Sequence, residues 1–206
     1  FLKVYMSSNR KLKMLMTVIA LQTGTDGKVT SDLVQIWSSN NLKWSANARR
    51  DFVACWGAIV TMASATVQPK LLSKLSVFNY TAVGNLFVWF GLTLHGLKES
   101  SLCMIGGVPF LLPGVNGGAA HGVRALASQI AINEGYGNGE FSAWLMNMRT
   151  LMTSGMTYTL GLWYARCVRR GIYAGTTWWI AGFFGGMLPQ LLIMSMPAKD
   201  FDPAKS

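Results

Sequence analysis

The sequence predicts an all-α integral membrane protein with about six transmembrane helices, and three observations support that fold class. Only 13% of its 206 residues are charged, whereas a soluble domain has about 25%. The run from Ser100 to Val123 contains no Asp, Glu, Lys or Arg, and at ~1.5 Å per residue a helix of this length can cross a ~30 Å hydrocarbon core. Basic residues form short clusters at the ends of apolar runs, where long side chains reach the lipid headgroups.

We expect a single membrane domain over residues 1–206. The expected helices span about residues 11–37, 52–69, 75–97, 100–132, 140–165 and 171–197, followed by a polar tail, residues 198–206. The first helix follows a basic flank and is the most polar of the six. Side chains such as Thr23 and Asp32 in it require a face lined by protein or water. The alternative for this segment is an apolar half-turn that lies against the other helices.

Uncharged runs and turn residues define the other five helices. The second ends at Gln68-Pro69, and the third contains Asn85 and His95. The fourth is the Gly- and Pro-rich run that includes Ser100 to Val123, and the loop NEGYGNG ends it. An arginine cluster closes the fifth helix. The sixth is uncharged and has Trp178-Trp179 near its start, where aromatic side chains suit a membrane interface.

Glycines at four-residue spacing predict close contacts between helices. Gly114, Gly118 and Gly122 are four apart in the fourth helix, and Gly182 and Gly186 are four apart in the sixth. Residues at this spacing share one helical face, and without side chains they let a neighbouring backbone approach.

Composition argues against several function classes. The net charge of +10 could suggest nucleic acid, but the basic residues flank apolar runs and form no continuous patch, so no nucleic-acid partner is expected. The three cysteines lie far apart in or beside apolar runs and are expected to pack as small apolar residues. No nucleophile–base pair, paired carboxylates or metal-ligand cluster is visible, so we expect no enzyme, no catalytic residue and no metal site.

Ionisable and amide side chains inside the expected helices are the candidate binding residues, because a charge in hydrocarbon is costly. Asp26 is the first candidate, since Gln22, Asp26 and Thr30 would share one face of a continuous helix. A carboxylate there could bind a proton or a cationic substrate. The alternative places Asp26 at a helix end in water.

Arg149 and Asn116 complete the candidate substrate- or ion-binding set. Arg149 lies inside the fifth expected helix and could bind an anion or pair with Asp26. Its alternative is a side chain that reaches the headgroups or an ion pair near the loop. Asn116 and Asn85 could bind a ligand, although interhelical hydrogen bonding is the commoner role of such amides.

Glycine and proline placement resembles the C-terminal six-helix half of a major facilitator superfamily transporter. The run GGVPFLLPGVNGGAA, residues 106–120, resembles the tenth helix of that family, and a loop and a Gly-containing eleventh helix follow it. The matching positions there are Arg124, Ser128, Gly135, Gly139, Gly155 and Gly161. Residues 178–182 resemble the start of the twelfth helix, residues 12–44 the seventh helix and its loop, and residues 51–72 the eighth.

This resemblance implies secondary transport of a small solute by alternating access, with the chain as the C-terminal half of the carrier. The loop expected after the eighth helix, G-x-x-x-D-R-x-G-R-[RK], reads KLLSKLSVFNYT and contains no acidic residue and no Arg. Basic residues divide almost equally between the two membrane faces, and the sequence begins at Phe1. These features favour an alternative: a non-transporting structural or accessory subunit of a large photosynthetic or respiratory membrane complex that retains a half-carrier fold.

Either reading places the chain in a membrane as a multi-pass protein, in an organelle or elsewhere. No cofactor is expected apart from bound lipids, with pigments as well if the chain belongs to a photosynthetic complex. The expected partners are membrane lipids and either a missing N-terminal half, a second copy of the chain or the subunits of a larger membrane complex.

Overall fold

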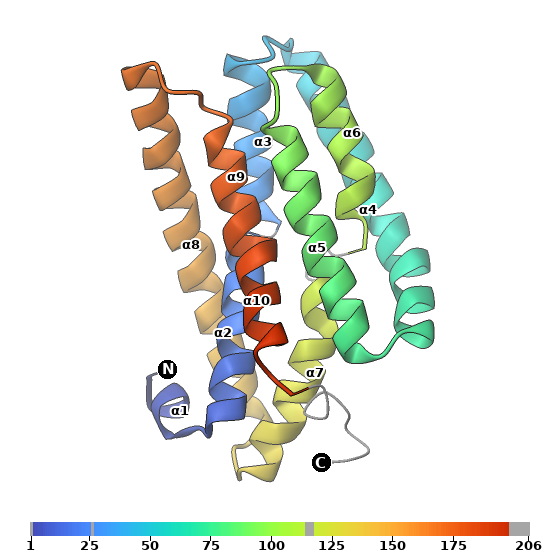
Figure 1. Cartoon of the computed structure of the whole chain (residues 1–206), viewed down its shortest axis with the longest axis vertical. Coiled ribbons are helices and arrows are strands. Elements are labelled where there is room, and N and C mark those ends of the chain that lie inside the picture. Colours follow the sequence, from blue (N-terminus) through green and yellow to red (C-terminus); the bar gives the residue numbers. More distant parts are fainter. Residues whose placement is uncertain (1, 26, 114–117, 198–206) are drawn as a thin grey trace.

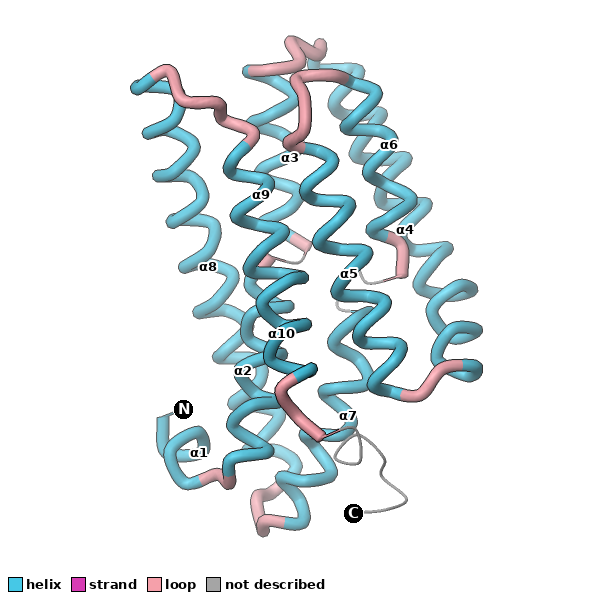
Figure 2. The backbone as a smooth tube through the Cα atoms, viewed as in Figure 1, coloured by secondary structure: helices cyan, strands magenta, loops and turns pink. Residues whose placement is uncertain are grey.

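The computed structural model describes residues 2–25, 27–113 and 118–197, and in this part of the chain helices are joined by loops and no strand is present (Figures 1 and 2). The all-α fold class is therefore confirmed. The helices are α1 (Leu2–Ser7), α2 (Arg10–Gly24), α3 (Lys28–Asn40), α4 (Ala46–Lys74), α5 (Val77–His95), α6 (Ser101–Leu111), α7 (Gly118–Asn133), α8 (Asn138–Arg170), α9 (Thr176–Gly182), the π-helix η1 (Phe183–Met187) and α10 (Leu188–Met194).

Three helical segments among the described residues are long and apolar enough to cross a membrane. They are α4, α5 and the continuous segment Thr176–Met194 that comprises α9, η1 and α10. They run roughly along the long axis of the bundle, with α5 beside α9 and η1 at its centre (Figure 1). These three apolar helices agree with the predicted class of membrane protein. The sequence predicted about six transmembrane helices.

Two segments that the sequence predicted as single helices are each divided in two. The range 11–37 consists of α2 and α3, and Gly27 between them has φ +56°, a backbone conformation that favours glycine. The range 100–132 consists of α6 and α7, and α6 ends at Leu111, two residues before Pro113. Pro113 has no backbone N–H and therefore cannot continue the helical hydrogen bonding beyond this point.

Two other helices extend beyond their predicted ranges because their ends are capped elsewhere. Helix α4 was expected over residues 52–69 but begins after Ser45, whose hydroxyl accepts a 3.2 Å hydrogen bond from the Ala48 N–H, and it continues through Pro69 to Lys74. Helix α8 runs to Arg170, where Gly171 adopts φ +65° and stops it.

The buried apolar residues form two clusters along the bundle. One cluster joins α1, α2, α7, α8 and α10, and includes Leu15, Val123 and Trp144. The other joins α3 to α6, α8 and α9 around Trp37 and Trp178. The boundary between the clusters falls near the end of α2, where the polar side chains described below are buried.

Candidate functional site

Three amide side chains from three helices form a buried hydrogen-bonded chain. Gln22 of α2 donates from Nε2 to Oδ1 of Asn85 on α5 at 2.7 Å. Asn85 donates from Nδ2 to Oε1 of Gln190 on α10 at 3.3 Å. Asn85 is fully buried and the other two side chains are 6% exposed. Buried amides are stable when each is hydrogen-bonded to another. The two hydrogen bonds of this amide triad connect α2, α5 and α10.

The π-helix η1 positions the amide triad. The N–H of Leu188 donates to the carbonyl oxygen of Phe183, five residues earlier, which gives this segment one extra residue per turn. A Cβ atom at Gly186 would overlap the carbonyl oxygen of Asn85 and lie 2.6 Å from the backbone nitrogen of Trp89. Glycine is therefore required for η1 to approach α5 this closely, directly beside Asn85.

Side chains satisfy the backbone where the long helices are interrupted. The hydroxyl of Thr30 donates to the carbonyl oxygen of Thr25 at 2.6 Å, across the break between α2 and α3. Beyond α6, Gln68 Nε2 donates to the Leu112 carbonyl at 3.2 Å and the Tyr80 hydroxyl donates to the Pro113 carbonyl at 3.3 Å. Carbonyl groups released from regular helical bonding are thus paired inside the protein.

Two arginines line a cavity between α2, α7 and α8. Its volume is about 190 Å³, and its walls include Thr23, Arg124, Ser142 and Arg149. Arg124 is half-buried and donates from Nη2 to the Thr23 hydroxyl oxygen at 3.2 Å, whereas Arg149 is exposed. None of the described residues that line the cavity carries a carboxylate.

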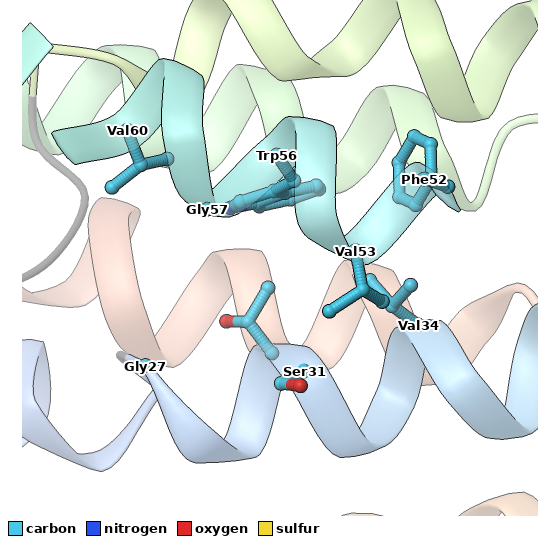
Figure 3. A pocket seen from close by; sticks show the side chains of 9 residues that line it. Gly27, Ser31, Val34, Phe52, Val53, Trp56, Gly57 and Val60 are labelled. Carbon is cyan, nitrogen blue, oxygen red and sulfur yellow. The ribbon is translucent and has the colours of Figure 1, made fainter. Parts of the chain in front are cut away.

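A second cavity, of about 240 Å³, lies between α3 and α4 (Figure 3). Phe52, Val53, Trp56 and Val60 of α4 face Val34 and Ser31 of α3 across it. Its lining is largely apolar, so it offers few polar groups to orient a ligand. Helix α4 packs against the rest of the bundle through few side chains, since only Val60, Ala63 and Gln68 of its 29 residues are buried.

His95 is a buried titratable side chain at the end of α5. It is fully buried. Among the described residues, the Met104 backbone of α6 lies beside the imidazole, although neither ring nitrogen makes a hydrogen bond of good geometry. Its ring lies edge-on to Trp178 with 5.0 Å between ring centroids, and 5.7 Å from the ring of Trp56. A Cβ atom at Gly107 would overlap this ring, so the glycine makes room for the imidazole.

The structure separates the residues that the sequence placed together. Gln22 and Thr30, expected on one face of a single helix, belong to α2 and α3 because the helix is interrupted near Gly27. Gln22 joins the amide triad, and Arg149 lines the arginine cavity. Asp26, Asn116 and Gly114 lie outside the described residues.

The remaining candidate glycines lie in α7 and in the last helical segment. Gly118 is the first residue of α7. A Cβ atom at Gly122 would lie 2.8 Å from Val77 Cγ1, and one at Gly182 would lie 3.1 Å from the Trp89 carbonyl oxygen. Both positions therefore face α5 closely.

Sequence reasoning missed Gln190 and the pairing of Arg124 with Thr23. Gln190 is the one amide in the apolar run 171–197, and that isolation was the available signal. The Arg124–Thr23 pair joins residues 101 positions apart, and no local pattern reveals such a contact.

Comparisons with protein-family models, with curated protein sequences and with solved structures found no match. Among the described residues, no group of three or more His, Cys, Asp or Glu side chains lies close enough to hold a metal ion. The candidate site therefore rests on the amide triad, the helix interruptions and the arginine cavity.

Proposed function

We propose that this chain is a transmembrane transporter domain of the major facilitator type, the C-terminal half of a carrier that moves a small solute by alternating access. The observation that carries the proposal is the pair of interrupted helices, α2–α3 and α6–α7, whose breaks lie part-way along the bundle (Figure 1). Carriers bind solutes near the bilayer midplane where helices are discontinuous, because the interrupted backbone offers polar groups there.

The polar interior supports this reading. Irregular backbone at membrane depth is tolerated where protein or a water-lined cavity surrounds it. At the two breaks, backbone carbonyl oxygens accept hydrogen bonds from the side chains of Thr30, Gln68 and Tyr80. Thr23 lies in the wall of the arginine cavity and stands two residues before Thr25, at the break between α2 and α3. The cavity therefore adjoins one of the two breaks.

In this proposal six helical units cross the membrane. Three of them are the apolar helices α4, α5 and Thr176–Met194. The other three are α2–α3, α6–α7 and α8. Helix α8 has 33 residues, which corresponds to about 50 Å and exceeds the thickness of a hydrocarbon core of about 30 Å. The lower apolarity of α8 and α2–α3 is the property expected of helices that face a solute pathway or a partner.

The exposed surfaces of the helices differ in how many small and polar side chains they carry. Helix α5 and the segment α9–α10 expose bulky apolar side chains that suit lipid, including Phe90, Phe183 and Leu191. Helix α8 exposes bulky apolar side chains such as Leu151 and Tyr158, and between them it exposes small and polar side chains at Asn147, Thr150, Ser154, Gly155 and Thr159. Small and polar residues favour helix–helix contact over lipid contact. We therefore place the second half, either an N-terminal half or a second copy of the chain, against α8.

The same surface could hold a permanent neighbour, which is the alternative function. In that case the chain is a structural or accessory subunit of a larger membrane complex, and α8 is a fixed interface. The two functions differ in whether the interior opens to each side of the membrane.

Sided cysteine labelling tests the proposal. In a background with Cys55, Cys103 and Cys167 replaced by Ser, Ser31→Cys places a thiol in the cavity between α3 and α4. Alternating access predicts reaction with a membrane-impermeant maleimide in both right-side-out and inside-out vesicles. Leu86→Cys, on the exposed apolar face of α5, is the control and should react from neither side. Reaction of the Ser31→Cys thiol from one side alone would favour the structural subunit.

A further inference from the structure

The last turns of α8 present three arginines on the outer surface of the bundle. Arg166, Arg169 and Arg170, here called the arginine cluster, are all exposed, and Gly171 ends the helix directly after them. Arg166 lies three residues before Arg169 and four before Arg170, so its side chain neighbours both of the others on the helix surface. Because a guanidinium stays protonated in proteins, this end of α8 carries a concentrated positive charge.

The charge of the arginine cluster is not balanced by an ion pair with any residue that the structure describes. Arg169 donates from Nε to a carbonyl oxygen of its own helix at 3.4 Å, and this bond does not use its two terminal amino groups. The α3–α4 and α5–α6 connections lie at the same end of the bundle (Figure 1). Near these connections, Glu99 accepts a 2.8 Å hydrogen bond from Asn41, and Asp51 pairs with Arg50 at 2.8 Å. Both carboxylates are therefore engaged with other partners.

The neighbouring helix α9 shows at which depth of the membrane the cluster lies. Thr176 is the first residue of the last apolar span, and its hydroxyl oxygen accepts a 3.1 Å hydrogen bond from Trp163 Nε1 and lies 3.5 Å from Cys167 Sγ. The hydrocarbon boundary therefore falls near these two residues of α8, and the arginines lie at it or beyond it. Tyr173 and Trp179 are exposed beside them, with 6.0 Å between their rings. Such aromatic side chains gather at the level of the headgroups.

Exposed apolar side chains lie on the same face of α8, one turn below the cluster. Leu162 precedes Arg166 by four residues, and Ala165 precedes Arg169 by four, so these four residues share one side of the helix. Leu162 is 50% exposed, and Ala165 is exposed as well. This face of α8 thus has a cationic end at headgroup depth and an apolar surface directly beneath it.

We propose that the arginine cluster binds the phosphate of an anionic membrane phospholipid, whose acyl chain lies against Leu162. Arginine binds phosphate through two parallel N–H donors, and basic clusters at the end of a membrane helix attract anionic lipids. The order of cationic and apolar groups along α8 matches the order of headgroup and chain in one phospholipid. The site lies beyond Thr159, the last of the small and polar residues proposed to contact a second half. The inference is therefore independent of transport.

A fluorophore next to the cluster reports which phospholipid lies there. Leu162→Cys is introduced into the full chain in the cysteine-free background and labelled with bimane. The protein is reconstituted with phosphatidylglycerol and phosphatidylcholine in equal amounts, and two preparations differ only in which lipid carries brominated acyl chains, which quench the fluorophore on contact. Arg166→Gln with Arg169→Gln removes two charges of the cluster. Lys43→Gln with Lys98→Gln, two exposed lysines of other connections at the same end of the bundle, is the matched control.

Brominated phosphatidylglycerol should quench more strongly than brominated phosphatidylcholine, with a preference of at least about fivefold. The preference should disappear in the double arginine variant and persist in the double lysine variant. Equal quenching by the two lipids in the parent protein would overturn the inference. A preference that survives in the arginine variant would overturn it too, and so would an equal loss in both double variants, because the lipid would then respond to the charge of the whole bundle end. Circular dichroism checks that both variants keep the helix content of the parent.

Discussion

The side chain of Gln22 donates a 2.7 Å hydrogen bond to the side chain of Asn85, 63 positions along the chain. Asn85 in turn donates to Gln190 at 3.3 Å, so one fully buried amide connects the second helix to the last. Because each of these groups would otherwise lie unpaired in an apolar interior, the triad favours one arrangement of α2, α5 and α10 over any other.

The coupling between Gln22 and Asn85 can be measured with a double-mutant cycle of Gln22→Leu and Asn85→Leu. Each single substitution leaves a buried partner unsatisfied, so we expect a loss of about 1–3 kcal/mol in the free energy of unfolding. The double variant should lose less than the sum, with a coupling of about 0.5–2 kcal/mol. Reversible unfolding with sodium dodecyl sulfate in mixed micelles gives these energies. Additive losses would show that the bond contributes nothing to stability.

Gly186→Ala should destabilise the protein, because the added methyl group would overlap the Asn85 carbonyl oxygen. We expect a loss of about 1–3 kcal/mol as η1 moves away from α5. Gly161→Ala is the matched control, since a Cβ atom there has nothing within 4 Å and alanine favours a helix by about 1 kcal/mol. Thermal unfolding followed by circular dichroism distinguishes the two variants. Equal melting temperatures for both would contradict the close approach of η1 to α5.

His95→Leu should be tolerated, because neither imidazole nitrogen of His95 makes a hydrogen bond of good geometry within the described residues. Replacing an unpaired buried polar group by an apolar one is close to neutral or stabilising. The lost ring contacts with Trp178 and Trp56 offset part of that gain. We expect a free energy of unfolding within about 1 kcal/mol of the parent protein. A loss above about 2 kcal/mol would indicate that a hydrogen bond holds the imidazole, the nearest candidate partner being the Met104 backbone.

The ends of α5 should lie on opposite sides of the membrane. Lys74, before α5, and Lys98, after it, are both exposed, and the helix between them is apolar enough to span. In the cysteine-free background, Lys74→Cys and Lys98→Cys should each react with an impermeant maleimide from one face, and the two faces should differ. Labelling of both from the same face would show that α5 does not cross.

The sequence predicted helix positions well where an apolar run ends in clear stop signals. The third helix was expected over residues 75–97, and α5 spans Val77–His95 with Ser76 capping its start and Gly96 at its end. The interruption near Gly27 was missed because the polar residues around it also fit one helical face. A positive φ at a glycine has no signature in periodicity.

The candidate site was less predictable than the fold class. Gln22 and Arg149 were identified because polar groups are conspicuous in apolar helices. Asn85 was also a candidate, but its pairing with Gln22 and the lining of the arginine cavity were not predicted, since these residues come from helices far apart in sequence. The pairing depends on how the helices rotate about their axes, and that rotation is set by packing at glycines such as Gly186.

The extra residue in η1 acts as a phase shift within the last helical segment. Each residue advances an α-helix by about 100°, so α10 is turned by roughly that angle from the position that a continuous helix would give it. Gly182 before the shift and Gln190 after it both face α5. Without the additional residue, the amide of Gln190 would be rotated away from Asn85, and the two halves of the segment would face α5 through different sides. A single inserted residue therefore brings Gly182 and Gln190 onto the side of the segment that faces α5.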